Sequence, residues 1–181
     1  MGTRTFRHLV AVCGLLCSAG CATQIDSPQE AYDGTYFSYD KYAARTIVTG
    51  KALLHVTLGL NQTRYLATSL DGEGRINASW IDLTEKSEDF VSLYFAAHDD
   101  RAQPLRVQSL GHDRPHKDED ASEEVAVYLP PGYLEAHAAT GIDIRVDGRN
   151  AYTTTTIPAL YVQGYVKKLA EVEACVKAKS C

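Results

Sequence analysis

A hairpin that runs directly into a helix is the feature that most constrains how this chain can fold. Ile142–Val146 alternates apolar and polar residues, and Asp147-Gly148 follows as a turn. The chain then returns through Ala151–Ile157, which is rich in threonine. This order predicts a two-stranded antiparallel hairpin. Pro158 is expected to be the first residue of a helix, because the N–H groups of the first helical turn have no partner within the helix and proline has no N–H to leave unpaired.

An apolar stripe with helical spacing continues beyond Pro158. Its members recur three or four residues apart and are Val162, Tyr165, Val166, Leu169, Val172 and Val176. Lysines and glutamates fill several of the positions between them. The spacing predicts an amphipathic helix, capped near Thr156 or Ile157, that packs one face on a sheet.

The middle of the chain carries the signals of short strands separated by turns. Runs rich in β-branched, aliphatic and aromatic residues cover 46–60, 64–70, 75–83, 90–97, 105–110 and 125–129. Asp71-Gly72-Glu73-Gly74 predicts a hairpin connection, and Tyr133–Ala139 predicts a short helix. We therefore expect a mainly β fold, an antiparallel β-sandwich or curved sheet, with the short helix and the C-terminal amphipathic helix. Residues 45–181 then form a single globular domain.

The N-terminus has a different character from the rest of the chain. Two arginines within the first eight residues precede an uninterrupted apolar run, Leu9–Leu16. Small residues follow and end in Ala19-Gly20-Cys21. This order is typical of a secretory signal, and the run is shorter than the roughly 20 residues that span a bilayer.

The sequence Ala19-Gly20-Cys21 resembles the lipobox of bacterial lipoproteins, although Ser18 stands where that family usually has leucine. The resemblance implies that residues 1–20 are a signal peptide that is removed and that Cys21 carries lipid. Several acyl chains on one cysteine give stable membrane attachment. Signal cleavage without lipid and an uncleaved anchor are the alternatives.

Residues 21–44 are expected to form a lipidated tether that leads into the domain. In the lipoprotein family, Ala22 after the cysteine implies the outer membrane, with the domain facing the periplasm. The later half of the tether holds aromatic residues that either dock on the domain or form a contact strip for a partner: Tyr32, Tyr36, Phe37, Tyr39 and Tyr42.

Two cysteines, Cys175 and Cys181, remain after Cys21. An exported protein meets an oxidising compartment, where such a pair predicts a disulfide. This bond would fasten the last turn of the helix to the chain end. A redox or metal role is the alternative, but the spacing is not that of a Cys-x-x-Cys site.

The charge of the chain is acidic and argues against nucleic acid as a partner. Removal of residues 1–20 takes away two arginines and no acid, which changes the formal net charge from −5 to −7. Acids concentrate in residues 112–124, a polar loop that solvation alone can explain. As a contact for a basic partner, this loop offers Asp118, Glu119 and Asp120. Its two histidines, His112 and His116, make weak divalent-metal binding an alternative.

Catalytic patterns are sparse. The sequence has no Gly-x-Ser-x-Gly elbow, phosphate loop or dinucleotide fingerprint, and we expect no cofactor. His98 beside Asp99 and Asp100 is one place for a general acid or base, although such residues more often form a turn. Thr153–Thr156 offers hydroxyls on a strand that a partner strand could extend, or is ordinary solvent-facing strand.

These observations favour an envelope lipoprotein that binds another protein without catalysis. A specific version is an inhibitor or immunity protein whose acidic loop contacts a basic partner. The alternatives are a periplasmic hydrolase that acts on envelope material through His98 or His112 and neighbouring carboxylates, and a weak divalent-metal-binding protein.

Overall fold

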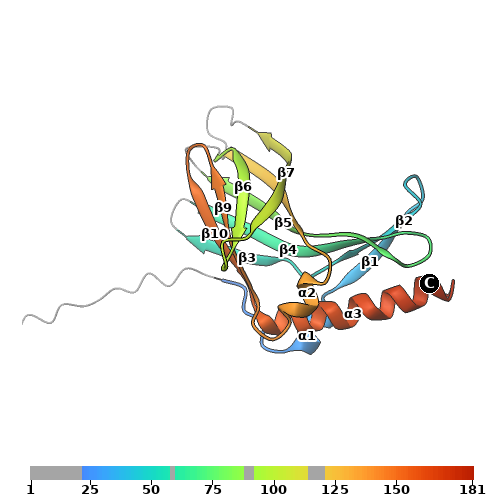
Figure 1. Cartoon of the computed structure of the whole chain (residues 1–181). Coiled ribbons are helices and arrows are strands. Elements are labelled where there is room, and N and C mark those ends of the chain that lie inside the picture. Colours follow the sequence, from blue (N-terminus) through green and yellow to red (C-terminus); the bar gives the residue numbers. More distant parts are fainter. Residues whose placement is uncertain (1–21, 58–59, 88–91, 114–120) are drawn as a thin grey trace, which may run out of the picture.

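The strands of the protein join into one antiparallel sheet (Figure 1). The computed structural model describes residues 22–57, 60–87, 92–113 and 121–181. Nine of the ten described strands follow the order β1-β2-β4-β5-β8-β7-β6-β9-β10, and the tenth, β3, pairs with β4 beside this path. The strands are β1 (Tyr36–Asp40), β2 (Arg45–Thr49), β3 (Leu53–Thr57), β4 (Leu60–Leu70), β5 (Ile76–Ser87), β6 (Tyr94–Asp99), β7 (Pro104–Asp113), β8 (Ala121–Leu129), β9 (Ile142–Gly148) and β10 (Tyr152–Ile157). The helices of this part are α1 (Pro28–Asp33), α2 (Tyr133–Ala136) and α3 (Ala159–Lys177).

The β4–β5 hairpin is the centre of the sheet, and its turn is the predicted one. Asp71 Oδ1 accepts hydrogen bonds from the backbone N–H groups of Glu73 and Arg75, both at 2.9 Å. Gly74 has a φ of 72°, which costs a glycine little because it has no Cβ. The hairpin then pairs from Leu70 opposite Ile76 to Leu60 opposite Ser87.

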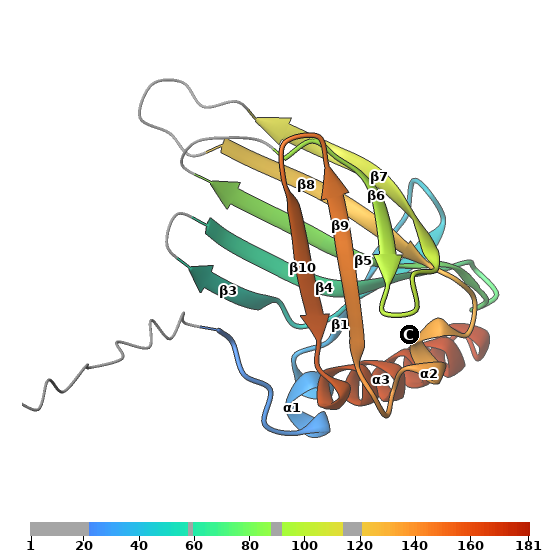
Figure 2. The ribbon, with the colours of Figure 1, turned by 60° about the vertical axis from the view of Figure 1, so that its left-hand side comes forward.

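The sheet curls, so that it has an inner and an outer face. Alternate residues of β5, among them Ile81 and Leu83, point to the inner face and are fully buried. The β9–β10 hairpin lies across this inner face (Figure 2): Arg64 Nε on β4 donates to the carbonyl of Thr156 at 2.9 Å. The mainly β class with a curved antiparallel sheet is confirmed; the sandwich form of the prediction is not.

The helix α3 packs its predicted stripe on the inner face of the sheet (Figures 1 and 2). Of the predicted stripe, Val162, Tyr165, Leu169 and Val172 are buried, whereas Val166 and Val176 are partly buried. Tyr161, which was not part of the predicted stripe, is also buried. Its start differs slightly from the prediction, because Pro158 is the N-cap residue and the helix begins at Ala159. Among the described residues, no helix is both long and apolar enough to cross a membrane.

The segment assigned to the tether contributes to the fold. Ser27 caps α1 by accepting a hydrogen bond from the N–H of Glu30 at 3.2 Å. The helix then lies so close to α3 that a Cβ added at Gly164 would stand 2.1 Å from the carbonyl oxygen of Pro28. The strand β1 pairs with β2 at one edge of the sheet. The ordered fold therefore begins well before residue 45.

The aromatic residues of β1 and the following turn do not dock on the domain. Tyr36, Phe37, Tyr39 and Tyr42 are 60%, 42%, 64% and 91% exposed. Only Tyr32, on α1, approaches α3, where its hydroxyl hydrogen-bonds Glu171.

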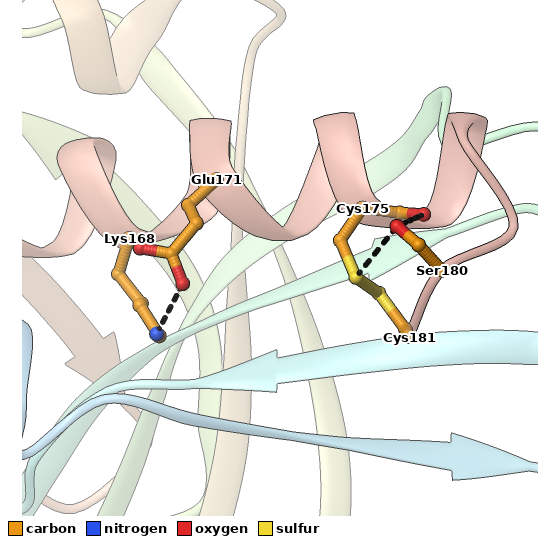
Figure 3. The surroundings of a disulfide bond; sticks show 5 residues. All are labelled: Lys168, Glu171, Cys175, Ser180 and Cys181. Carbon is orange, nitrogen blue, oxygen red and sulfur yellow. Dashed lines mark hydrogen bonds and ion pairs between the residues drawn. A yellow bond between two sulfur atoms is a disulfide. The ribbon is translucent and has the colours of Figure 1, made fainter.

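The two C-terminal cysteines lie at disulfide-bonding distance (Figure 3). Cys175 is on the last turns of α3, and Cys181 folds back to it with a Cα–Cα distance of 5.4 Å. Ser180 Oγ donates to the carbonyl oxygen of Cys175 at 3.3 Å, which helps to hold the return. The predicted pairing therefore agrees with the geometry.

Candidate binding site on the outer face

The outer face of β5 carries the most unusual group of the molecule, the carboxyl group of Asp82. The same alternation that turns Ile81 inward turns Trp80 and Asp82 outward. Asp82 stands between Tyr65 on β4 and Ala126 on β8 in the register of the sheet. An acid on an outer sheet face is ordinarily solvated, but Asp82 is only 5% exposed.

A hollow of about 530 Å³ opens over this part of the sheet, and we name it the Asp82 hollow. Its size falls in the range of roughly 300–1,000 Å³ that is common for ligand pockets. Strands β5, β7 and β8, the β1–β2 turn and the end of β4 supply its walls. The lining residues are Ala43, Ala44, Arg45, Ser69, Asp71, Asn77, Ala78, Trp80, Asp82, Gln108, Leu110, Ala126 and Tyr128.

One oxygen of Asp82 has no partner. Oδ1 is buried and accepts no hydrogen bond from any residue that the structure describes. Burial, reinforced by the negative charge of Glu124, raises the pKa of Asp82 to about 6, while hydrogen bonding to Tyr65 and Trp80 opposes the rise. An unpaired buried carboxylate is costly, so this group is available to a ligand that can satisfy it.

The neighbours of Asp82 make the site more acidic. Glu124 lies on β8 two residues before Ala126, and therefore on the same face of the sheet. Burial, and next the charge of Asp82, raise the pKa of the Tyr65 phenol, which keeps it neutral and able to donate a hydrogen bond. Arg45 is the single base among the lining residues, and it pairs with Asp40 at 3.6 Å. The lining residues thus leave the charge on Asp82 uncompensated.

Aromatic rings form the floor beside the acid. The rings of Trp80 and Tyr128 have centroids 6.1 Å apart and are tilted by 38°. The guanidinium of Arg106 stacks over Tyr128, with Cζ 3.6 Å from the ring centroid. The Tyr128 hydroxyl donates to Gln108 Oε1 at 3.0 Å. These contacts position the ring of Tyr128, and hydrogen bonding to Trp80 connects the floor to the Asp82 carboxyl group.

A second hollow of about 340 Å³ adjoins the first, since both are lined by Asn77, Ala78 and Tyr128. It extends past Arg106 towards α2 and the Pro130-Pro131 corner. Asp82 lines the first hollow and Arg106 lines the second, so the two neighbouring hollows present an acid and a base.

The inner face holds two further buried acids, and both are fully used. Glu85 accepts from Ser92 Oγ at 3.0 Å and from the Tyr94 hydroxyl at 2.6 Å. Glu123 accepts from the backbone N–H groups of Leu93 and Tyr94 at 2.8 and 2.7 Å. Together these carboxylates anchor the start of β6 on the central strands, which is a structural role.

The residues predicted from the sequence do not meet at the Asp82 hollow. Asp118, Glu119, Asp120 and His116 lie outside the described residues, as does Cys21. The described ends of their loop are Asp113 and Ala121. Ala121 is five residues from Ala126 along β8, a distance of about 17 Å for an extended strand. On β7, Leu110 lines the hollow and is three residues from Asp113, the other described end of the loop.

The predicted histidines are far apart. His98 pairs with Pro104 at one end of β7, and His112 is near the other end opposite Glu123. Eight residues of strand separate these positions, about 26 Å. Among the described residues, no group of three or more His, Cys, Asp or Glu side chains could hold a metal ion.

The remaining candidate residues, Asp99 and the threonines of β10, have structural roles in their own part of the fold. Asp99 Oδ1 accepts from the N–H groups of Arg101 and Gln103 at 3.0 and 2.8 Å, so it builds a turn. In β10, Thr153 and Thr155 are buried and the alternate threonines are exposed. Gln62 Nε2 donates to Thr153 Oγ1 at 2.9 Å, so that hydroxyl serves the inner face.

Sequence reasoning missed Asp82, although a signal was present. In Trp80-Ile81-Asp82-Leu83 the acid alternates with apolar residues within a strand. This pattern predicts an outward acid but gives no reason for its burial, which comes from the side chains of neighbouring strands. Comparison with known proteins adds no further assignment: no family model, no curated protein and no solved structure matches this chain.

Proposed function

We propose that this protein is an envelope lipoprotein whose domain binds a partner protein without catalysis, and that the Asp82 hollow receives a basic side chain of that partner. The observation that carries the binding proposal is the buried, unpartnered Oδ1 of Asp82 in a hollow of about 530 Å³. A lysine or arginine would neutralise the acid pair and satisfy the free oxygen. Trp80 and Tyr128 would add cation–π contacts and cover for an aliphatic stem.

The N-terminal residues support the proposed location. Ala19-Gly20-Cys21 supports a lipid anchor on Cys21, and Ala22 supports the outer membrane with the domain facing the periplasm. The pairing distance of Cys175 and Cys181 suits an oxidising compartment. Replacement of Cys21 by serine should release the protein from the membrane fraction; a Cys21→Ser protein that stays in that fraction would refute the anchor.

A photocrosslinking amino acid at Gln108 tests the binding site in the native host. Gln108 lines the hollow and is exposed. We expect crosslinks to one envelope protein at a peptide that contains lysine or arginine. The yield should fall at least tenfold in Asp82→Asn, because the amide carries no charge to pair with the base.

Two variants make this test specific. Asp100→Asn is the matched control, since Asp100 is exposed at the end of β6 and does not line the hollow; it should keep the crosslink. The combined replacement of Asp118, Glu119 and Asp120 by their amides tests the acidic loop. If the loop variant loses the crosslink and Asp82→Asn keeps it, the partner binds at the loop and the hollow is not the site.

A hydrolase is the second candidate, and one observation favours it. A carboxyl group with a pKa of about 6 beside a second acid, Glu124, is suited to general acid catalysis near neutral pH. Incubation of the full-length protein with cell-wall material, followed by mass spectrometry of released fragments, tests this candidate. Release that disappears in both Asp82→Asn and Glu124→Gln would establish the hydrolase and exclude the non-catalytic proposal.

A further inference from the structure

The first described residues of the chain are fastened to the edge strand β3. Ala22 forms an antiparallel bridge with His55. The N–H of Thr23 donates to the carbonyl of Leu54 at 2.7 Å, and the N–H of Leu54 donates to Thr23 Oγ1 at 3.0 Å. These contacts occupy the side of Leu54 that faces away from β4. Residues 22–23 therefore act as a short added strand.

The next residues continue this attachment without a break. Ile25 is only 5% exposed and belongs to the hydrophobic core. The N–H of Asp26 donates to Glu30 Oε2 at 3.0 Å, and Glu30 Oε1 pairs with Lys51 Nζ at 2.5 Å. Lys51 stands two residues before β3, so this ion pair ties the start of α1 to the same edge. We name residues 22–30 the N-terminal clasp.

No free residues separate Cys21 from the folded domain, because the clasp begins at Ala22. Neighbouring Cα atoms are about 3.8 Å apart across a trans peptide, so a lipid on Cys21 would be attached next to β3. A flexible tether over residues 22–44 would instead give a root-mean-square reach of about 25 Å. The attachment point is thus fixed relative to the sheet.

From this geometry, and resting on the lipid anchor of the proposed function, we propose that the domain lies directly against the bilayer with the β3 edge towards the lipid. The strand suits this contact, because Leu53–Thr57 contains no carboxylate and Leu54 is 43% exposed. Of the two acids in the clasp, Glu30 pairs with Lys51 and Asp26 is exposed. The occupant of this edge is the headgroup and upper acyl region of the membrane that holds the lipid.

Depth-dependent fluorescence quenching tests this orientation. In a Trp80→Phe background, which removes the single tryptophan, Leu54→Trp probes β3 and Ile76→Trp is the matched control. Ile76 is similarly exposed, at 44%. On β4, Leu54 is paired with Thr63 and Ile76 is paired with Leu70. Seven residues of strand separate Thr63 from Leu70, so the two tryptophans would be about 23 Å apart. The lipidated full-length proteins are reconstituted in phosphatidylcholine vesicles with brominated acyl chains.

We expect at least twofold stronger quenching for Leu54→Trp than for Ile76→Trp. Insertion of ten glycine and serine residues between Cys21 and Ala22 should abolish the difference, because the clasp would then no longer set the distance to the bilayer. Equal quenching in proteins whose intact mass shows acylated Cys21 would overturn this orientation alone. An unmodified Cys21 after expression in the native host would overturn the anchor and this inference together.

Discussion

Two acids on the same strand, Asp82 and Glu85, are equally buried but differ in what surrounds them. Each is 5% exposed. Glu85 faces inward, and both of its oxygens accept hydrogen bonds from Ser92 and Tyr94. Asp82 faces outward into a hollow, and its Oδ1 accepts none from the described residues. The strand β5 therefore presents a completed polar contact on one face and an incomplete one on the other.

The difference separates a structural acid from a candidate binding acid. A buried carboxylate stabilises a fold only when hydrogen bonds replace the water it has lost. Glu85 meets that condition with partners from its own chain, whereas Asp82 lines the hollow and its buried Oδ1 accepts no hydrogen bond from the described residues. If this distinction is correct, removal of the two charges should change stability in opposite directions.

Glu85→Ala should have the largest effect. It removes two hydrogen bonds to a charged acceptor and leaves the Tyr94 hydroxyl buried without that partner, so we expect a loss of about 2–4 kcal/mol in the free energy of unfolding. Urea denaturation at pH 7, followed by circular dichroism, measures it. A loss below about 0.5 kcal/mol would show that water replaces Glu85 easily and that the two faces do not differ.

Asp82→Asn should stabilise the free protein at pH 7. The folded pKa of Asp82, about 6, lies above the unfolded value of about 3.9. The wild-type protein therefore has its full stability below pH 4 and loses about 2–3 kcal/mol as the pH rises through 6. The asparagine variant avoids this loss, so the two proteins should agree near pH 4, diverge between about pH 4 and pH 6, and keep a constant difference above pH 6.

The single tryptophan offers an independent measure of this titration. Trp80 lines the Asp82 hollow, so its emission should change as Asp82 ionises near pH 6. The change should vanish in Asp82→Asn and move to lower pH in Glu124→Gln, which removes the neighbouring charge. If the emission change near pH 6 persists in Asp82→Asn, another group titrates there, and the raised pKa of Asp82 no longer supports the binding site.

The sequence was sufficient for elements whose signals are local. The turn at Asp71–Gly74 and the hairpin of β9 and β10 were predicted, because turn residues and alternation specify them within a few positions. The predicted turn at Asp147-Gly148 was wrong, since both residues belong to β9 and Asp147 pairs with Tyr152. The stripe of α3 was predicted for the same reason, since helical spacing marks its buried face. The cysteine pair followed from simple counting and reaches bonding distance.

The site and the N-terminal segment depend on contacts that the sequence does not display. The pKa of Asp82 is raised by burial within the sheet and by the charge of Glu124 on the neighbouring strand β8, so no local pattern around Asp82 predicts it. The segment before residue 45 is polar and was assigned to a tether. Its place in the fold depends on the close approach of Pro28 to Gly164, residues more than a hundred positions apart.

Removal of the Cys175–Cys181 pair should have a smaller effect that is independent of both faces. A bond that closes a loop this short stabilises by about 2 kcal/mol in the chain-entropy model. Its position at the exposed end of α3 means that fraying can absorb part of this loss. Thermal unfolding of a Cys175→Ser, Cys181→Ser double variant should show the loss equally at pH 4 and pH 7. A change in its pH dependence would connect the chain end to the Asp82 hollow.

Tyr165→Phe should have the smallest effect and the sharpest contrast with Asp82→Asn. The Tyr165 hydroxyl donates to Thr68 Oγ1 at 2.9 Å and is within hydrogen-bonding distance, 3.2 Å, of the Val48 carbonyl. Thr68 keeps a second partner, Ser79, so we expect a loss of only about 1 kcal/mol. Burial raises the pKa of Tyr165, so its hydroxyl stays neutral and the loss should be constant between pH 4 and pH 8. If Tyr165→Phe destabilises equally at every pH and Asp82→Asn stabilises increasingly from about pH 4 to pH 6, the pH-dependent loss of stability belongs to the buried carboxyl group of Asp82 on the outer face.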